Sequence, residues 1–360
     1  MIRSLSPYYV TVPFVSPASS ETCTSYTLNV YIWDGLKASV PATVTYSYTK
    51  SNPTASTGSD KINISRILSD YIEPTPIEGT TSGIYDADIT WWVKYEYTYV
   101  TDEPTDATTP QGTTTSIYSR GYTYGNEGEN ITTVTDRKLF AVDEFKVDRT
   151  GFYCVPILLD ESLDTVVTVL SYPNSEINYT STTPVGDATT TSSELVQNVW
   201  VNLSETTLDT YVVVSVDAVE LCTILIEDEG KYSPLDIFFI NKYGCQQSFT
   251  FFKEKTDSLT ITDSQFESDR GQPSAGNHQF VRFNVQGREE FRVNTGWIDE
   301  ENNETVKQLL LSELIWSYDG TNFTPLNIKT KSQEWKTQQK NKLINYEIGF
   351  EYSYNEINNI

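Results

Sequence analysis

The sequence predicts a mainly-β protein, with two or three β-sandwich-like units of the immunoglobulin or fibronectin kind and a few short helices. The dominant hydrophobic period is two, which is typical of strands with one buried face. The 360 residues include 24 Tyr and 15 Phe and are also rich in Thr, and these residue types favour sheet. Short apolar runs are separated by turn signals, as in sandwiches. The sequence has no Cys–Trp–Cys framework, so the immunoglobulin assignment is an analogy of architecture.

Three runs alternate most clearly between apolar and polar residues: 40–49, 91–99 and 344–354. In the last run, a shift of one residue would turn every apolar side chain from Ile344 to Tyr354 towards solvent, so its register is well specified. Further strands are predicted at 26–33, 166–172, 211–217, 221–226, 236–241 and 280–285.

Two helices are predicted. Residues 62–72 place apolar side chains on one helical face, with Asn63 or Ser65 as the cap and Pro74 beyond the end. Residues 299–313 begin with three acids, which the helix dipole favours at an N-terminus, and continue with an apolar face.

The chain is divided by composition. Residues 101–116 and 180–193 are rich in Thr, Pro, Asp and Gly, which predicts long exposed loops at least as well as linkers between domains. Charged turns near 148–151 and 228–231 are the expected boundaries. The predicted domains are an amino-terminal β-sandwich-like domain at 1–150, a middle β domain at 151–230, and a carboxy-terminal β domain with one covering helix at 231–360.

Composition disfavours several classes of function. The formal net charge of -24 and the pI near 4.3 repel a phosphate backbone, so no nucleic-acid partner is expected. A single His leaves little room for a His-based site. No window approaches the ~18 apolar residues of a membrane span. The amino terminus lacks the apolar core of a secretory signal, so we expect synthesis and folding in a reducing cytosol.

The cysteines form no C-x-x-C pair, which argues against a zinc ribbon or a thioredoxin motif. We expect them to be small buried apolar side chains, with a disulfide between distant pairs left open as the alternative. The four are Cys23, Cys154, Cys222 and Cys245.

No catalytic, cofactor-binding or metal-binding residue is assigned, and we expect a protein that is not an enzyme and has no cofactor. His278 lies in a turn-rich stretch, and the chain has no G-x-S-x-G elbow. The turn at 125–130 is acidic, the wrong charge for a phosphate loop. In a chain with 49 acids, neighbouring carboxylates arise from composition alone. These neighbours are Asp86 and Asp88, Asp143 and Glu144, Asp160 and Glu161, Glu227 to Glu229, and Asp299 to Glu301. The first pair lacks the later ligands of a calcium loop, and a calcium site elsewhere stays open.

A succession of short phrases carries a resemblance to a known group of proteins. They lie at 28–35, 62–65, 231–244, 249–252, 293–298, 308–313 and 344–351, most densely from Lys231 onward. This succession resembles virion structural proteins of tailed phages of the Bacteroidota, including crAss-like phages. The resemblance implies a non-enzymatic, multi-copy component of the tail, neck ring or fibre attachment. Its partners would be further copies of itself and other virion proteins, and it would be made in the host cytoplasm and located in the virion.

The matching phrases indicate folding signals, such as turns at Gly244 and Gly296, so no functional residue is carried over from the group. Aromatic anchors and long Thr-rich loops suit assembly through large surfaces. Two alternatives remain. One is a module of a tail or head fibre that binds a host-surface glycan or receptor through exposed aromatics of one loop cluster. The other is a depolymerase, which would require two acids facing across a cleft.

Overall fold

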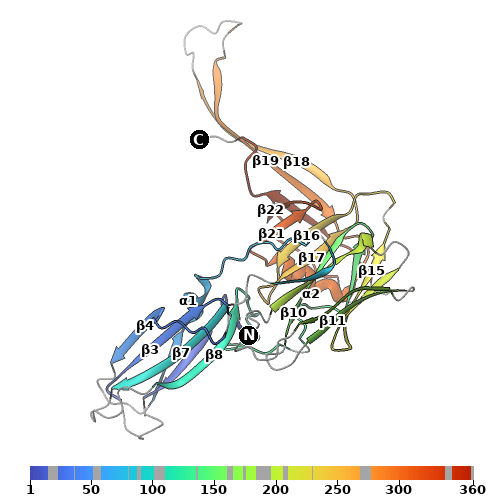
Figure 1. Ribbon diagram of the computed structural model, residues 1–360. Coiled ribbons are helices and arrows are strands. Elements are labelled where there is room, and N and C mark those ends of the chain that lie inside the picture. The colour runs from blue at the N-terminus through green and yellow to red at the C-terminus, as the bar shows by residue number, and fades with distance from the viewer. Residues whose placement is uncertain are drawn as a thin grey trace.

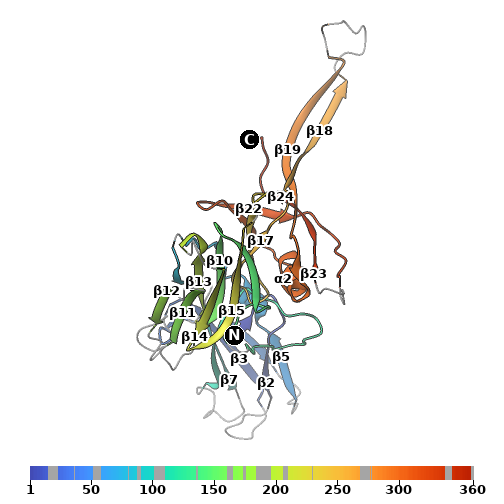
Figure 2. The same cartoon turned by 90° about the vertical axis from the view of Figure 1, so that its right-hand side faces the viewer.

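The computed structural model describes most of the chain. The described residues are 1–14, 23–35, 37–51, 58–79, 81–86, 91–100, 110–134, 137–159, 165–172, 176–183, 196–205, 210–228, 230–267, 276, 278–336 and 343–357. The mainly-β class is confirmed, with several sheets and two short α-helices in these residues. Figures 1 and 2 show the blue and cyan strands at one end of the molecule and a long orange hairpin at the other.

The amino-terminal strands form a five-stranded sheet beside a two-stranded one. The first has the order β1 (Ile2–Arg3), β8 (Gln111–Ser119), β7 (Trp91–Val100), β3 (Ser25–Trp33) and β4 (Tyr46–Ser51). The second joins β2 (Tyr9–Pro13) to β5 (Ser59–Asn63), which leads into α1 (Ser65–Ser69). Tyr26 and Tyr99 from the large sheet share a buried core with Leu68 of the helix.

Two further sheets enclose the next core. The three-stranded sheet has the order β10 (Phe152–Leu158), β13 (Val196–Asn202) and β6 (Gly83–Asp86). The five-stranded sheet has the order β12 (Glu176–Thr183), β11 (Thr165–Tyr172), β14 (Tyr211–Val216), β15 (Val219–Glu227) and β9 (Glu144–Asp148). A 3-10 turn, η1 (Leu203–Glu205), follows β13. Buried aliphatic residues such as Val155, Val169 and Val214 join both sheets in one core.

The carboxy-terminal strands form a seven-stranded sheet. Its order is β17 (Gln246–Phe251), β16 (Leu235–Ile240), β21 (Ile315–Tyr318), β22 (Phe323–Ile328), β24 (Glu347–Tyr352), β19 (Phe280–Asn294) and β18 (Thr256–Glu267). A small sheet pairs β20 (Ile298–Asp299) with β23 (Leu343–Ile344), and η2 (Glu300–Asn302) leads into α2 (Asn303–Leu310). Val306 and Leu309 of α2 are buried with Phe350 of the sheet, so the helix, which is shorter than the predicted 299–313, covers this core.

Most predicted strands are confirmed within two residues, but the run at 40–49 is wrong in part. Only its end forms β4, where Tyr46 is exposed because β4 is the edge of its sheet, and Val40 lies outside any strand and is exposed as well. The run at 344–354 is divided between β23 and β24, although Ile344, Ile348 and Phe350 are buried as expected.

The predicted helix at 62–72 is shorter than expected, since Ile62 and Asn63 pair with β2 instead. The Asn63 carboxamide oxygen still accepts a bond from the Ser65 backbone N–H at 3.0 Å, at the start of α1. The loop expected at 101–116 is also wrong in part, because residues from Gln111 form β8 and the Thr side chains suit a strand. The start of 180–193 lies in β12, and its remainder lies outside the described residues.

The three-domain division stays a prediction, and two strand pairings connect its segments. β6, from 1–150, pairs with β13, and β9, also from 1–150, pairs in parallel with β15.

The amino-terminal and carboxy-terminal sheets meet at a backbone junction formed by 119–122 and 241–245. The Ser119 hydroxyl donates to the Tyr243 carbonyl at 2.6 Å, and the Tyr122 N–H donates to the Lys242 carbonyl at 2.8 Å. The buried Asn241 carboxamide organises the turn, because its oxygen accepts the N–H groups of Tyr243 and Cys245. Its NH₂ group donates to the Leu139 carbonyl at 2.7 Å, so one side chain connects distant parts of the chain.

Gly121 and Gly244 allow this close approach. A Cβ on Gly121 would lie 2.7 Å from the Lys242 carbonyl oxygen, and Gly244 has a φ of +77°. We expect Gly121→Ala to lower the free energy of unfolding by about 3 kcal/mol, because backbone atoms cannot rotate out of the way. Denaturant unfolding measures the change. Gly125→Ala is the control, since no described atom lies within 4 Å of its new Cβ, and equal losses in both variants would contradict the junction.

Candidate interaction site

The most distinctive surface of the molecule is a two-stranded ribbon, here called the arm, formed by β18 and the part of β19 paired with it. In both views it extends beyond the rest of the molecule (Figures 1 and 2). Every residue of β18 is exposed. Phe291 and Val293, at the inner end of β19, are buried beside β24, so the arm is anchored in the sheet.

The sequence of β18 suits a ribbon exposed on both faces. Its even positions from Thr256 to Ser264 are all hydroxyl residues, while Leu259 and Ile261 occupy the opposite face. The register shifts between Thr262 and Ser264, where Asn284 on the partner strand has a positive φ of 50°. This is the geometry of a β-bulge, which increases strand twist.

Apolar side chains are exposed along the whole arm. Leu259 and Ile261 lie on one face, and Phe266 packs edge-to-face on Phe283 with ring centroids 5.6 Å apart. These four residues and Phe280 keep between 48% and 60% of their surface exposed. A two-stranded hairpin is marginally stable alone in water, and a row of exposed apolar residues marks an interaction surface.

The arm carries charges of both signs. β18 and β19 together carry five carboxylates and three arginines, so their net charge of -2 over 27 residues has about the same density as -24 over 360 residues for the protein. Asp263 pairs with Arg282 at 2.9 Å, and Arg288 pairs with Glu351 at 3.1 Å.

A cleft of about 860 Å³ lies where β9 and β10 meet the carboxy-terminal sheet. Asp236 lines it and accepts hydrogen bonds from the Thr250 hydroxyl at 2.6 Å and the Phe152 N–H at 3.2 Å. Burial raises the pKa of Asp236 to about 6, and these two donors and the nearby Asp148 carboxylate modify the shift less.

The other carboxylates of the cleft have structural partners. Asp148 accepts from the Thr150 N–H and hydroxyl, and Asp228 pairs with Arg149 at 2.7 Å. Asp319 accepts the N–H groups of the following turn. Within the described residues, no group of three His, Cys, Asp or Glu side chains is placed to hold a metal ion. The cleft thus offers one protonatable carboxyl and a set of turn-forming acids.

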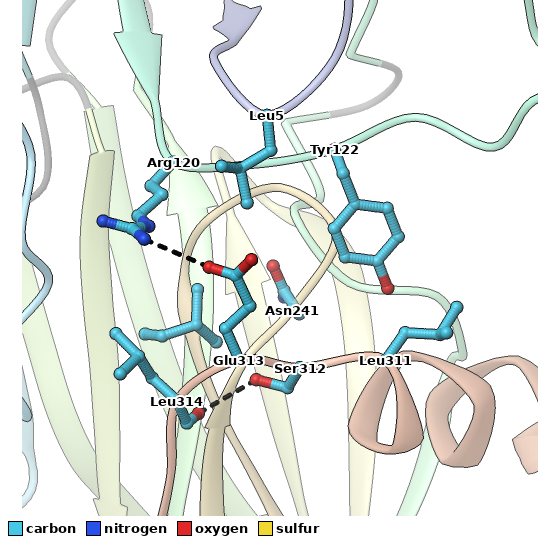
Figure 3. A pocket seen from close by; sticks show the side chains of 9 residues that line it. Leu5, Arg120, Tyr122, Asn241, Leu311, Ser312, Glu313 and Leu314 are labelled. Carbon is cyan, nitrogen blue, oxygen red and sulfur yellow. Dashed lines mark hydrogen bonds and ion pairs between the residues drawn. The ribbon is translucent and has the colours of Figure 1, made fainter. Parts of the chain in front are cut away.

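A smaller cavity lies beside the junction, lined by Arg120 and Tyr122 on one side and residues 311–314 on the other (Figure 3). Arg120 pairs with Glu313 at 3.1 Å and donates to the Ile72 carbonyl at 3.1 Å. The accessible volume of about 20 Å³ is that of a single water molecule. This cavity is too small for an organic ligand.

The acids named from the sequence that fall in the described part of the chain are not brought together as a site. Asp143 pairs with Lys138, and Glu227 pairs with Lys146 at 2.7 Å. Asp299 precedes η2, which holds Glu300 and Glu301 at the start of the α2 segment. Asp88, Asp160, Glu161 and Glu229 lie outside the described residues, and His278 lies just before β19.

The cysteine prediction is confirmed. All four thiols are buried, none of these four residues forms a disulfide, and burial raises their pKa values.

Sequence reasoning missed β18. Its apolar residues are too sparse to give an alternating apolar row, and only its run of Ser and Thr at every second position indicates a strand.

Comparison with known proteins gives no family: no family model, curated protein or solved structure matches the chain. Among the described helices, none has the length and apolar character needed to cross a membrane.

Leu259→Ala is expected to change the free energy of unfolding by less than about 0.5 kcal/mol, because this side chain is exposed on the arm. Leu309→Ala is the matched control, since the same change in a buried side chain costs about 2–5 kcal/mol. Chemical denaturation of both variants measures the contrast. A large loss for Leu259→Ala would show that the arm packs on the body.

Asp236 also gives a pH prediction. A carboxyl whose pKa is raised in the folded state binds its proton more tightly there, so stability falls as the pH rises from about 4 to about 6. Asp236→Asn should remove this fall, which we expect to be about 1–2 kcal/mol because the side chain keeps some contact with water. Thermal unfolding between pH 4 and 7.5 measures it. Asp228→Asn, on the exposed rim of the cleft, is the control, and an unchanged profile for Asp236→Asn would contradict the assignment.

Proposed function

We propose that this protein is a non-enzymatic structural protein of a tailed-phage virion, a multi-copy component of the tail, neck ring or fibre attachment. The observation that carries the proposal is the arm, which exposes apolar side chains on both faces and projects from a well-packed body. An isolated chain gains nothing from such a ribbon, whereas an assembled one can bury it against a neighbour.

The body supports the same proposal. Its largest aromatic side chains, including Trp92, Trp200 and Tyr118, are buried within the chain, so they stabilise the subunit itself. We take the packed sheets to be β-sandwich-like units that hold the arm in a fixed direction. The strongly acidic surface keeps free subunits apart and soluble until specific contacts form.

The direct test is the composition of gradient-purified phage particles, in which mass spectrometry should find this chain in a fixed number of copies. A particle preparation that lacks the chain, from cells that produce it, would contradict the proposal.

The arm gives a second prediction on particle assembly. The double change Phe266→Ser and Phe283→Ser should leave the body folded, since both rings are exposed, and should reduce incorporation into particles at least tenfold. Thr260→Ser is the control on the same arm. Normal incorporation of the double variant would show that these two rings of the arm are not needed for assembly.

A second candidate function is favoured by the exposed rings of Phe266, Phe280 and Phe283 towards the outer end of the arm. Grouped aromatic side chains at the end of a projection suit a module that binds a host-surface glycan or receptor. Binding of purified chain to host polysaccharide, lost in the Phe266→Ser and Phe283→Ser variant, would favour this function over the first.

A further inference from the structure

The seven-stranded sheet has one covered edge and one open edge. Every residue of β17, the first edge, is buried, and its Ser248 hydroxyl accepts the Cys154 N–H of β10 at 3.0 Å. At the other edge, no strand of the described chain pairs with the outer side of β18. This edge is long, extended and exposed, which is the arrangement that accepts another strand.

We propose that β18 pairs edge to edge and antiparallel with β18 of a second copy of this chain, to give the four-stranded ribbon β19–β18–β18′–β19′. Because β17 is covered, this sheet cannot extend from one copy to the next by its two different edges. Pairing of β18 with its own copy uses the same edge on both chains, so the contact is isologous and two-fold symmetric. The inference rests on the arm being an assembly element, as the proposed function has it.

The side chains of β18 suit a register centred on Ile261. In this register each Ile261 opposes its copy, and Leu259 of each chain lies next to that pair on the same face, so four aliphatic side chains form one cluster. On the other face, Thr260 opposes Thr262 of the second copy, and Thr–Thr pairs are favourable across strands.

The same register keeps the acids apart. Asp257 opposes Gln265 of the second copy, and Asp263 opposes Leu259. No carboxylate of β18 directly faces another, which matters because like charges directly opposite each other are destabilising.

The geometry also suits two strongly acidic bodies. Antiparallel pairing places the bodies at opposite ends of the joint ribbon, and a 12-residue strand spans about 40 Å at ~3.4 Å per residue. That separation exceeds the Debye length of ~8 Å at physiological salt, so the negative charge of the bodies opposes the contact little.

A cysteine placed on the two-fold axis tests the proposal in the full-length chain. Opposed residues of an antiparallel pair have Cα atoms ~4.5–5.5 Å apart, within disulfide range. Ile261→Cys should therefore form a covalent dimer under mild oxidation, and the four buried native cysteines should not compete. Thr256→Cys is the control, since in this register it opposes Phe266 and lies about 30 Å from its own copy.

Light scattering of the unmodified protein gives a second measurement, and we expect the mass of a dimer that Ile261→Lys reduces to a monomer with an unchanged circular-dichroism spectrum. A monomeric unmodified chain, or equal cross-linking at 256 and 261, overturns the proposal. Particles that contain the chain without a cross-link at 261 would overturn this pairing and leave the proposed function standing. A cross-linked dimer that is missing from particles would support the pairing and overturn the proposed function.

Discussion

The turn at 241–245 and the chain at 119–122 touch backbone to backbone, and this contact joins the amino-terminal sheet to the carboxy-terminal one. The approach is possible because neither Gly121 nor Gly244 carries a side chain. It holds because Asn241 uses both its oxygen and its NH₂ group within the buried turn. Around it, Lys307 lies over the Tyr124 ring and Tyr124 donates to Glu304 at 2.6 Å, so aromatic and charged side chains surround a backbone contact.

Local alternation predicted strands that have one buried face, but it missed β10, β13 and β17, which are buried on both faces and therefore do not alternate. Runs such as 26–33 and 91–99 can be recognised from the sequence alone, because one face of each strand lies in a core and apolar residues recur on that face. The errors arise where partners far along the chain decide the outcome. Ile62 and Asn63 have helical spacing, yet pairing with β2 draws them into a strand. Residues 40–49 alternate as a buried strand does, but Val40 lies outside any strand and Tyr46 begins an edge strand, which no residue pattern reveals.

The candidate site was harder to predict than the core, for a physical reason. A strand that is exposed on both faces has no need of an apolar row, so β18 differs little in composition from a Thr-rich loop. Its role depends on the sheet that anchors β19 and on the coverage of β17, and both are properties of the whole fold. The exposed phenylalanines form a common surface only because the pairing of β18 with β19 brings them together.

The pairing of β6 with β13 has a consequence for synthesis on the ribosome. Gly83 faces Trp200, so β6 leaves the exit tunnel more than a hundred residues before its partner. At ~5–20 residues per second that interval is on the order of ten seconds, during which β6 has no strand beside it. The strands of the amino-terminal sheet can pair in that time, while the residues of β6 remain unpaired. Nascent chains arrested before Trp200 should accordingly remain sensitive to protease near Gly83.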